Sequence, residues 1–167
     1  MNKYSLWLVP NDNDKKKLQE IIDTLSYEYK TPGFIPHLTL LGSIPGEEEG
    51  AIISVAHALR TQLMEVPVYL ASVESSEKYY KTIHIAVART PALLKAHQTA
   101  KSVCGHIPSE YTPHISLMYG HLPKETRTIV QERVAPLVPL DIILDKLHLV
   151  DTTNDAPSWK TLGVYQL

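Results

Sequence analysis

Hydrophobic and polar residues alternate at the start of the chain, as they do in a β-strand with one buried face. Across residues 3–9, three large hydrophobic side chains fall on one side, and Lys3, Ser5 and Trp7 fall on the other. Pro10 follows this pattern directly and ends it. The pattern predicts a strand whose apolar side faces the core and whose other side carries Trp7.

A helical period follows, from a cap at Asn13 or Asp14 to about Tyr29. The later periodicities predict three more helices, at about 47–63, 91–103 and 124–134. Six more strands are expected at about 34–42, 66–73, 82–88, 114–120, 140–150 and 160–166. Strand–helix–strand units mixed with hairpins predict an α+β fold. A chain of 167 residues favours one domain over residues 1–167.

One seven-residue frame occurs twice, roughly half the chain apart. Residues 34–40 are FIPHLTL and residues 111–117 are YTPHISL, which share the order aromatic, any residue, Pro, His, aliphatic, hydroxyl, Leu. Each copy follows a helix and a loop and precedes another helix. We therefore expect two similar lobes, each of which presents one copy to a shared cleft.

The spacing within the repeat places an imidazole beside a hydroxyl. Residues i and i+2 of a strand project from the same face, about 6.5–7 Å apart, so His37 lies with Thr39 and His114 lies with Ser116. A neutral imidazole can take a proton from an attacking water while a cationic one protonates the leaving oxygen, and hydroxyls can donate to phosphate oxygens. A lone strand histidine is usually structural, but the repetition of both groups favours phosphodiester hydrolysis.

Composition and charge narrow the partners. The chain is 44% hydrophobic and 20% charged, which is typical of globular proteins, and its formal net charge is −2. Proteins that bind duplex nucleic acid usually carry an excess of basic residues, and this chain does not. Its charge balance therefore favours a small cyclic nucleotide or an RNA end as the partner. No apolar run is long enough to predict a signal peptide or membrane association. Because Cys104 is the only cysteine, no internal disulfide is possible, and we expect a cytoplasmic monomer.

Metal ligation is the rival use of histidine. Five histidines outside the repeat lack the H-x-x-x-H and H-E-x-x-H spacings of metal sites, namely His57, His97, His106, His121 and His148. Cys104 also has no second thiol with which to share a metal ion. We therefore expect neither a metal nor another cofactor.

The repeat resembles the 2H phosphoesterase superfamily, which is named for two H-x-[T/S] motifs. The segments 4–10, 34–40, 111–119 and 159–162 are similar to plant and yeast cyclic phosphodiesterases, so the likeness covers nearly the whole chain. The resemblance implies a bilobal fold in which two antiparallel sheets line a central cleft and helices lie outside. It also implies metal-independent hydrolysis of nucleoside 2′,3′-cyclic phosphates to 2′-phosphates, and of ADP-ribose 1″,2″-cyclic phosphate to the 1″-phosphate.

The resemblance also implies roles for individual residues. His37 and His114 correspond to the catalytic pair. The substrate-binding positions correspond to Thr39, Ser116, Tyr119 and Trp7. Tyr119 lies five residues after His114, so in an ideal strand it would face away from the site unless the chain bends near Gly120.

Several alternatives stay open. Tyr79 and Tyr80 lie in a polar loop and are candidates to wall or cover a nucleoside, whereas His84 is more typical of a structural histidine. Relatives with the same motifs act on RNA 2′-5′ linkages or on RNA ends, and a non-catalytic nucleotide- or RNA-binding module would keep the same fold. The sequence also leaves open which histidine is the base and which is the acid.

Overall fold

The computed structural model describes residues 1–105 and 110–167, and His106 lies outside the described residues. Four helices are α1 (Asp12–Tyr29), α2 (Glu49–Arg60), α3 (Pro91–Cys104) and α4 (Lys124–Val134). Seven strands are β1 (Asn2–Pro10), β2 (Leu38–Gly46), β3 (Val66–Ser75), β4 (Ile83–Val87), β5 (His114–Met118), β6 (Leu140–Asp151) and β7 (Lys160–Gln166). Single 3₁₀ turns occupy Tyr79–Lys81 and Ala135–Leu137. This mixture confirms the predicted α+β class.

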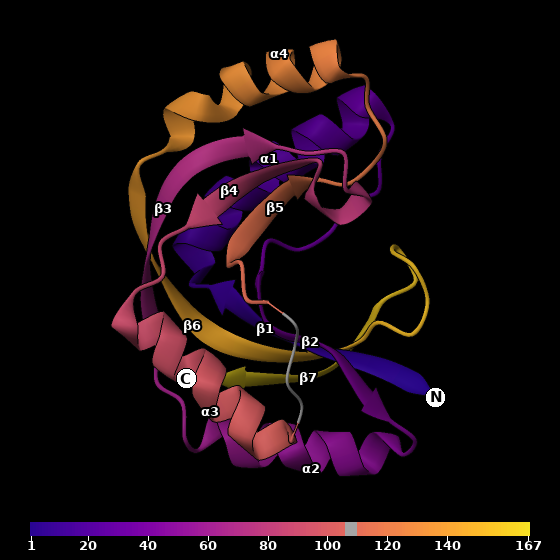
Figure 1. Cartoon of the computed structure of the whole chain (residues 1–167), viewed down its shortest axis with the longest axis vertical. Coiled ribbons are helices and arrows are strands. Elements are labelled where there is room, and N and C mark those ends of the chain that lie inside the picture. The colour runs from indigo at the N-terminus through magenta and orange to yellow at the C-terminus, as the bar shows by residue number, and fades with distance from the viewer. Residues whose placement is uncertain (106–109) are drawn as a thin grey trace.

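All seven strands belong to one antiparallel sheet in the order β1-β2-β5-β4-β3-β6-β7 (Figure 1). An additional pairing between β1 and β6 closes six of the strands into a ring, and β7 is added to the second half of β6. The shortest pairing in the ring joins β2 to β5, which pair only at Leu38 and Ile115 among the described residues. The two strands that carry the repeated motif are therefore neighbours.

The predicted division into two sheets is wrong, and the reason lies in β6. This strand has 12 residues, so its first half pairs with β3 and its second half pairs with β7. Its long span carries the hydrogen-bonded ladder from one half of the molecule into the other. The short pairing of β2 with β5 joins the halves a second time.

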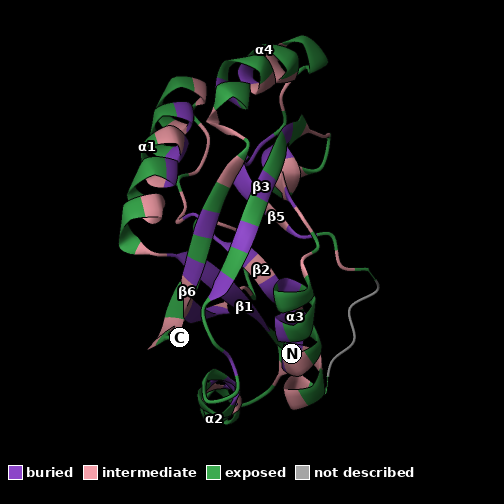
Figure 2. Ribbon diagram, turned by 90° about the vertical axis from the view of Figure 1, so that its left-hand side faces the viewer, coloured by how far each residue is buried: buried purple, intermediate pink, exposed green. Residues whose placement is uncertain are grey.

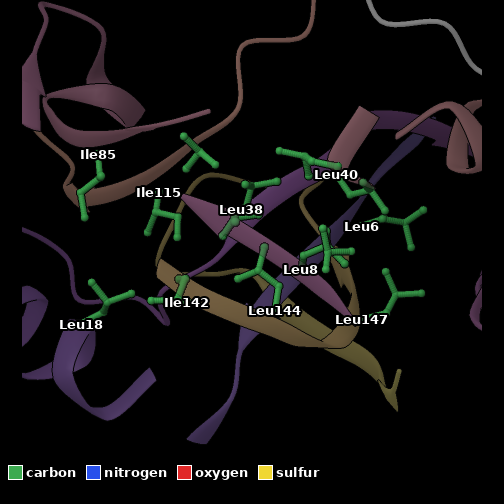
Figure 3. Packing of buried hydrophobic residues seen from close by; sticks show 14 of the residues in the cluster. Leu6, Leu8, Leu18, Leu38, Leu40, Ile85, Ile115, Ile142, Leu144 and Leu147 are labelled. Atoms are coloured by element: carbon green, nitrogen blue, oxygen red, sulfur yellow. The ribbon is translucent and has the colours of Figure 1, made fainter. Parts of the chain in front are cut away.

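The helices lie outside the sheet and leave its other face open. Helices α1 and α4 lie at one end of the molecule, and α2 and α3 lie at the other (Figure 1, Figure 2). Burial alternates along β3 as a half-covered strand requires. Aliphatic side chains from many strands and from helix residues such as Leu18 form one core, including the backbone-paired Leu38 and Ile115 (Figure 3). No helix of the described residues is long and apolar enough to cross a bilayer.

Two local predictions need correction. The cap of α1 is Asn11, whose side chain accepts the backbone N–H of Asp14, rather than Asn13 or Asp14 itself. Strand β2 begins at Leu38, so residues 34–37 precede it instead of forming its first residues. Pro36 has no N–H to donate to a ladder, and the Phe34 ring packs against Tyr119 at a centroid distance of 3.7 Å.

Candidate active site

A cleft of about 430 Å³ opens on the face of the sheet that the helices leave uncovered. All six residues singled out from the sequence line it: Trp7, His37, Thr39, His114, Ser116 and Tyr119. The candidate Tyr80 also lines the cleft, as do Lys3 and Ser5, which the sequence placed on the Trp7 face of the first strand. Residues that the sequence did not single out complete the lining: Gly42, Ser43, Thr152, Thr153, Asn154, Asp155 and Trp159. We refer to this lined space as the cleft.

The first motif copy places His37 immediately before β2, where its side chain is buried from solvent. Its side chain stacks on the Trp7 ring, with 3.7 Å between ring centroids and 10° between the planes. The residue is only 7% exposed. Its Nδ1 lies 2.8 Å from the carbonyl oxygen of Ile35, two residues earlier in the chain.

The second copy repeats this local contact. His114 begins β5, and its Nδ1 lies 2.9 Å from the carbonyl oxygen of Thr112, again two residues earlier. A carbonyl oxygen can only accept, so in both copies Nδ1 carries the hydrogen that is donated. The neutral form of each ring therefore keeps its lone pair on Nε2, which is the nitrogen left for proton transfer.

Burial sets the charge of both imidazoles. It lowers the pKa of His37 from 6.5 to about 4, the Ile35 hydrogen bond opposes this shift, and the charges of His114 and His148 add to it. Burial also lowers the pKa of His114, and Lys81 and Lys78 add to that effect. Both rings are consequently neutral at pH 7 when the cleft holds no anion. A bound phosphate would favour the protonated form of either ring.

The two hydroxyls of the repeat have different surroundings. Thr39 is partly exposed and lies opposite Trp7 in the pairing of β1 with β2. Ser116 is buried, and its hydroxyl donates to the carbonyl oxygen of Tyr80 at 2.8 Å. The Ser116 hydroxyl must turn away from that carbonyl before it can donate to a ligand.

Aromatic rings form one wall of the cleft. Trp159 meets Trp7 edge-on at 5.5 Å between centroids and stacks on Tyr80 at 5.3 Å. Its indole N–H donates to the Asn154 carbonyl at 2.7 Å, and the Tyr80 hydroxyl donates to Asp155 at 2.7 Å. The turn after β6 is thereby fastened against the wall. The sequence pointed to Tyr80 only as a candidate, and nothing in the pattern around Trp159 marks it as a cleft residue.

Tyr119 reaches the cleft because the strand ends before it. Strand β5 stops at Met118, and Gly120 has φ of 143°, a backbone conformation that favours glycine. The Tyr119 ring stacks on Phe34 at 3.7 Å between centroids, and burial raises the pKa of its hydroxyl. The bend near Gly120 that the sequence required is therefore present.

His97 joins the two motif copies, a contact that the sequence did not indicate. Its Nδ1 donates to the carbonyl oxygen of Leu40 in the first copy at 2.8 Å. Its ring stacks on Tyr111 of the second copy, at 3.7 Å and 4° between the planes. Because β2 and β5 share a single paired position, His97 in α3 adds a second connection between the strands that carry the catalytic candidates.

Two other candidates lie behind the cleft lining. The Tyr79 ring packs edge-on against Tyr80 at 4.9 Å, so it supports the wall rather than forming it. His84 lies edge-on to His114 at 5.5 Å, its Nδ1 donates to the Lys81 carbonyl at 3.1 Å, and burial lowers its pKa to about 4. Its Nε2 lies 3.4 Å from a carboxylate oxygen of Glu74, whose charge opposes that lowering of the pKa, and the ring packs beside His114.

Metal ligands do not gather in the described part of the chain. Across residues 1–105 and 110–167, no three His, Cys, Asp or Glu side chains are grouped so that they could hold a metal ion. The titratable groups that line the cleft are the two imidazoles, the hydroxyls of Tyr80 and Tyr119, whose pKa values are raised, and the side chains of Lys3 and Asp155.

The sequence and the fold both have known counterparts. The family model described as "Cyclic phosphodiesterase-like protein" matches residues 1–167. A cyclic phosphodiesterase of Arabidopsis thaliana is 23% identical over 175 residues, which cover 98% of this chain and 94% of the relative.

Two solved structures show the same fold. The protein TT0787 of Thermus thermophilus superposes with a TM-score of 0.65 at 16% identity, covering 99% of this chain and 97% of that one. Escherichia coli LigT complexed with 3′-AMP superposes with a TM-score of 0.61 at 11% identity, covering 99% of this chain and 98% of that one.

Proposed function

This chain belongs to the cyclic phosphodiesterase-like protein family, a group of 2H phosphoesterases, and we propose that it opens cyclic phosphates on nucleotides without a metal ion. His37 and His114 act as the general acid–base pair. The observation that carries the proposal is their matched geometry in one cleft, where each Nδ1–H is committed to a carbonyl two residues earlier. Each ring thus presents Nε2 for proton transfer.

The proposed reaction adds one water to the cyclic phosphate. One neutral imidazole takes a proton from the water as its oxygen bonds to phosphorus. The bond from phosphorus to one ribose oxygen breaks, and the other imidazole, protonated when the phosphate is bound, gives its proton to that oxygen. The products are a phosphate monoester and a free hydroxyl, and proton exchange with solvent restores the pair.

Other cleft residues support this chemistry. Thr39 and Ser116 donate to the non-bridging phosphate oxygens, on which negative charge grows in the transition state. Trp7 and Tyr119 shape the space beside the phosphate, and Trp7 also fixes the His37 ring by stacking. These groups supply hydrogen bonds and orientation, whereas the imidazoles supply proton transfer.

The proposed substrates are nucleoside 2′,3′-cyclic phosphates, opened to 2′-phosphates, and ADP-ribose 1″,2″-cyclic phosphate. The subfamily likeness supports this choice, because the family model spans the whole chain and the Arabidopsis relative carries the same name. RNA 2′-5′ linkages and RNA ends are the alternative substrates. A non-catalytic nucleotide-binding module is less well supported, because binding alone does not require two proton-transfer groups.

Turnover on a panel of substrates tests the proposal. The panel contains nucleoside 2′,3′-cyclic phosphates, ADP-ribose 1″,2″-cyclic phosphate and 2′-5′-linked RNA, each with and without EDTA. We expect cyclic phosphates to be opened equally well in EDTA, with the 2′-phosphate identified by phosphorus NMR. If no phosphomonoester is released from any substrate, a binding module is favoured. Activity that is lost in EDTA and restored by a divalent ion would exclude the two-histidine mechanism. A product that is mainly the 3′-phosphate would mean that the 2′-oxygen, rather than the 3′-oxygen, is the leaving group.

A further inference from the structure

A second pocket adjoins the cleft behind its aromatic wall. It has a volume of about 220 Å³ and shares Trp7 and Trp159 with the cleft. Its other lining residues are Gly33, Phe34, Ile35, Val150, Ala156, Pro157 and Thr161. We call this space the outer pocket.

The two tryptophans form the partition between the spaces. Tyr80 lines the cleft but not the outer pocket, and it stacks on Trp159 at 5.3 Å between centroids. Trp159 therefore borders the cleft together with Tyr80 and borders the outer pocket without it. Trp7 is only 4% exposed and belongs to the lining of both spaces.

The chemistry of the outer pocket differs from that of the cleft. Its lining among the described residues is aromatic and aliphatic, with Thr161 as the one hydroxyl and with no charged side chain. Such a surface does not attract a phosphate, which would need a cation or several donors. It suits a flat, weakly polar ring, because indole faces stack on nucleobases of any sequence.

Building on the proposed function, we propose that the outer pocket holds a nucleobase that is joined, through a phosphate or a diphosphate, to the ribose whose cyclic phosphate lies between His37 and His114. Continuity with the cleft carries this assignment, because Trp7 packs against His37 and also borders the outer pocket. A nucleotide bound in the cleft therefore has its next base within reach of the partition. Substrates with two bases gain a stacking contact that a cyclic mononucleotide lacks.

A variant that fills the outer pocket separates this contact from catalysis. Thr161 lies exposed on β7, outside the core and outside the cleft, so Thr161→Phe introduces a ring there and Thr161→Val is the size-matched control. The substrates are a dinucleotide that ends in a 2′,3′-cyclic phosphate and the same molecule with its first base replaced by hydrogen. The quantity compared is the ratio of their kcat/KM values.

We expect the wild type to prefer the two-base substrate by about tenfold, as one stacked base predicts. Thr161→Phe should reduce the preference to within about twofold of unity, and Thr161→Val should retain it. A wild type with no preference, or a Thr161→Phe variant that keeps the full preference, would overturn the proposal.

Two further arms complete the test. If the wild type turns over neither substrate, the proposed function fails, and the outer pocket is then tested by binding of the same two molecules. Trp7 and Trp159 are the only tryptophans of the chain, so their fluorescence reports that binding, with the same ratios expected for Kd. ADP-ribose 1″,2″-cyclic phosphate compared with the analogue that lacks adenine distinguishes a base linked through a diphosphate from a base of an RNA end. The substrate whose kcat/KM falls more when its base is removed is the one whose base occupies the outer pocket. If base removal lowers kcat/KM for neither substrate, the proposal is contradicted.

Discussion

The two copies of the motif have the same local geometry and different surroundings. In both, the histidine Nδ1–H donates to the carbonyl two residues earlier, at 2.8 Å in the first copy and 2.9 Å in the second. In both, the leading aromatic residue stacks on a ring from elsewhere in the chain, Phe34 on Tyr119 and Tyr111 on His97. The seven-residue frame therefore encodes the imidazole–carbonyl contact within itself, whereas its aromatic residue takes a partner from another segment.

Their surroundings separate the copies. His37 is buried and lies flat on Trp7, whereas His114 is more exposed and meets His84 edge-on. Burial lowers the pKa of His37 to about 4, and it also lowers the pKa of His114, which is the more exposed of the two. The repeated motif thus places two like groups in one cleft, and their unequal burial is expected to give them unlike proton affinities. In the free protein, the first proton of the pair is expected on His114.

Removal of either imidazole should have the largest effect. We expect His37→Ala and His114→Ala each to lower kcat by about 10²- to 10⁴-fold with a smaller change in KM, because each deletes one proton-transfer group. His37→Asn is the matched variant, since its amide N–H can still reach the Ile35 carbonyl while Nε2 is lost. Steady-state kinetics measures these losses, and circular dichroism checks that each variant is folded. A folded variant that keeps the wild-type kcat would show that its histidine is not required for the reaction.

Removal of the motif hydroxyls should have the next largest effect on kcat/KM, and the loss should be larger for Thr39 in the first copy than for Ser116 in the second. We expect Thr39→Ala to lower kcat/KM by roughly 10- to 1,000-fold, because one hydrogen bond to the transition state is lost. Ser116→Ala should cost less, since Ser116 gives up its bond to the Tyr80 carbonyl in order to bind phosphate. Thr39→Ser keeps the hydroxyl and is the control. A larger loss at Ser116 would reverse this ranking of the copies.

The connection between the copies should matter at about the tenfold level. His97→Phe keeps a ring for Tyr111 but leaves the Leu40 carbonyl without its donor, which should shift β2 relative to β5 and lower kcat by about tenfold. The exposed neighbour Gln98→Phe controls for added bulk on α3. Unchanged kcat together with a loss of stability in urea would make His97 structural only.

The smallest expected difference between the two copies is in how the free energy of unfolding changes as the pH falls. The pKa of His37 is about 4 when folded and near 6.5 when unfolded, so the unfolded chain binds the extra proton as pH falls. Stability conferred by neutral His37 is thus complete above pH 6.5 and is lost toward pH 4, by up to about 1.4 kcal/mol per pH unit. Urea unfolding at several pH values should give a flatter slope for His37→Asn than for His114→Asn. Equal slopes would contradict the inferred difference in pKa between the two imidazoles.

Most of the fold follows from local pattern. Alternation predicted β1, although the structure buries both of its faces from Tyr4 to Pro10, and the helical period predicted α1, whose one covered face the sequence displays directly. The number of sheets could not be predicted in this way. It depends on which strands flank each half of β6, and a strand's own residues do not name its partners. The start of β2 was missed because Phe34 is held by Tyr119, far along the chain.

The candidate site divides along the same line. His37, Thr39, His114 and Ser116 could be found because the repeat contains them within seven residues. Trp159 and His97 could not, since each acquires its place only through contacts with other segments, such as Asn154 and Tyr80 for Trp159. The catalytic role of the repeat, the monomeric state and the cellular compartment stay predictions.

The central claim is that His37 and His114 form one proton-transfer unit, and the double variant tests it most directly. The kcat of His37→Ala/His114→Ala is compared with both single variants on one cyclic nucleotide. Residues that act as a unit are strongly non-additive, so we expect the double variant to be no more than a few fold slower than the slower single variant. Losses that multiply, or a single variant that keeps near-full activity while folded, would contradict the account.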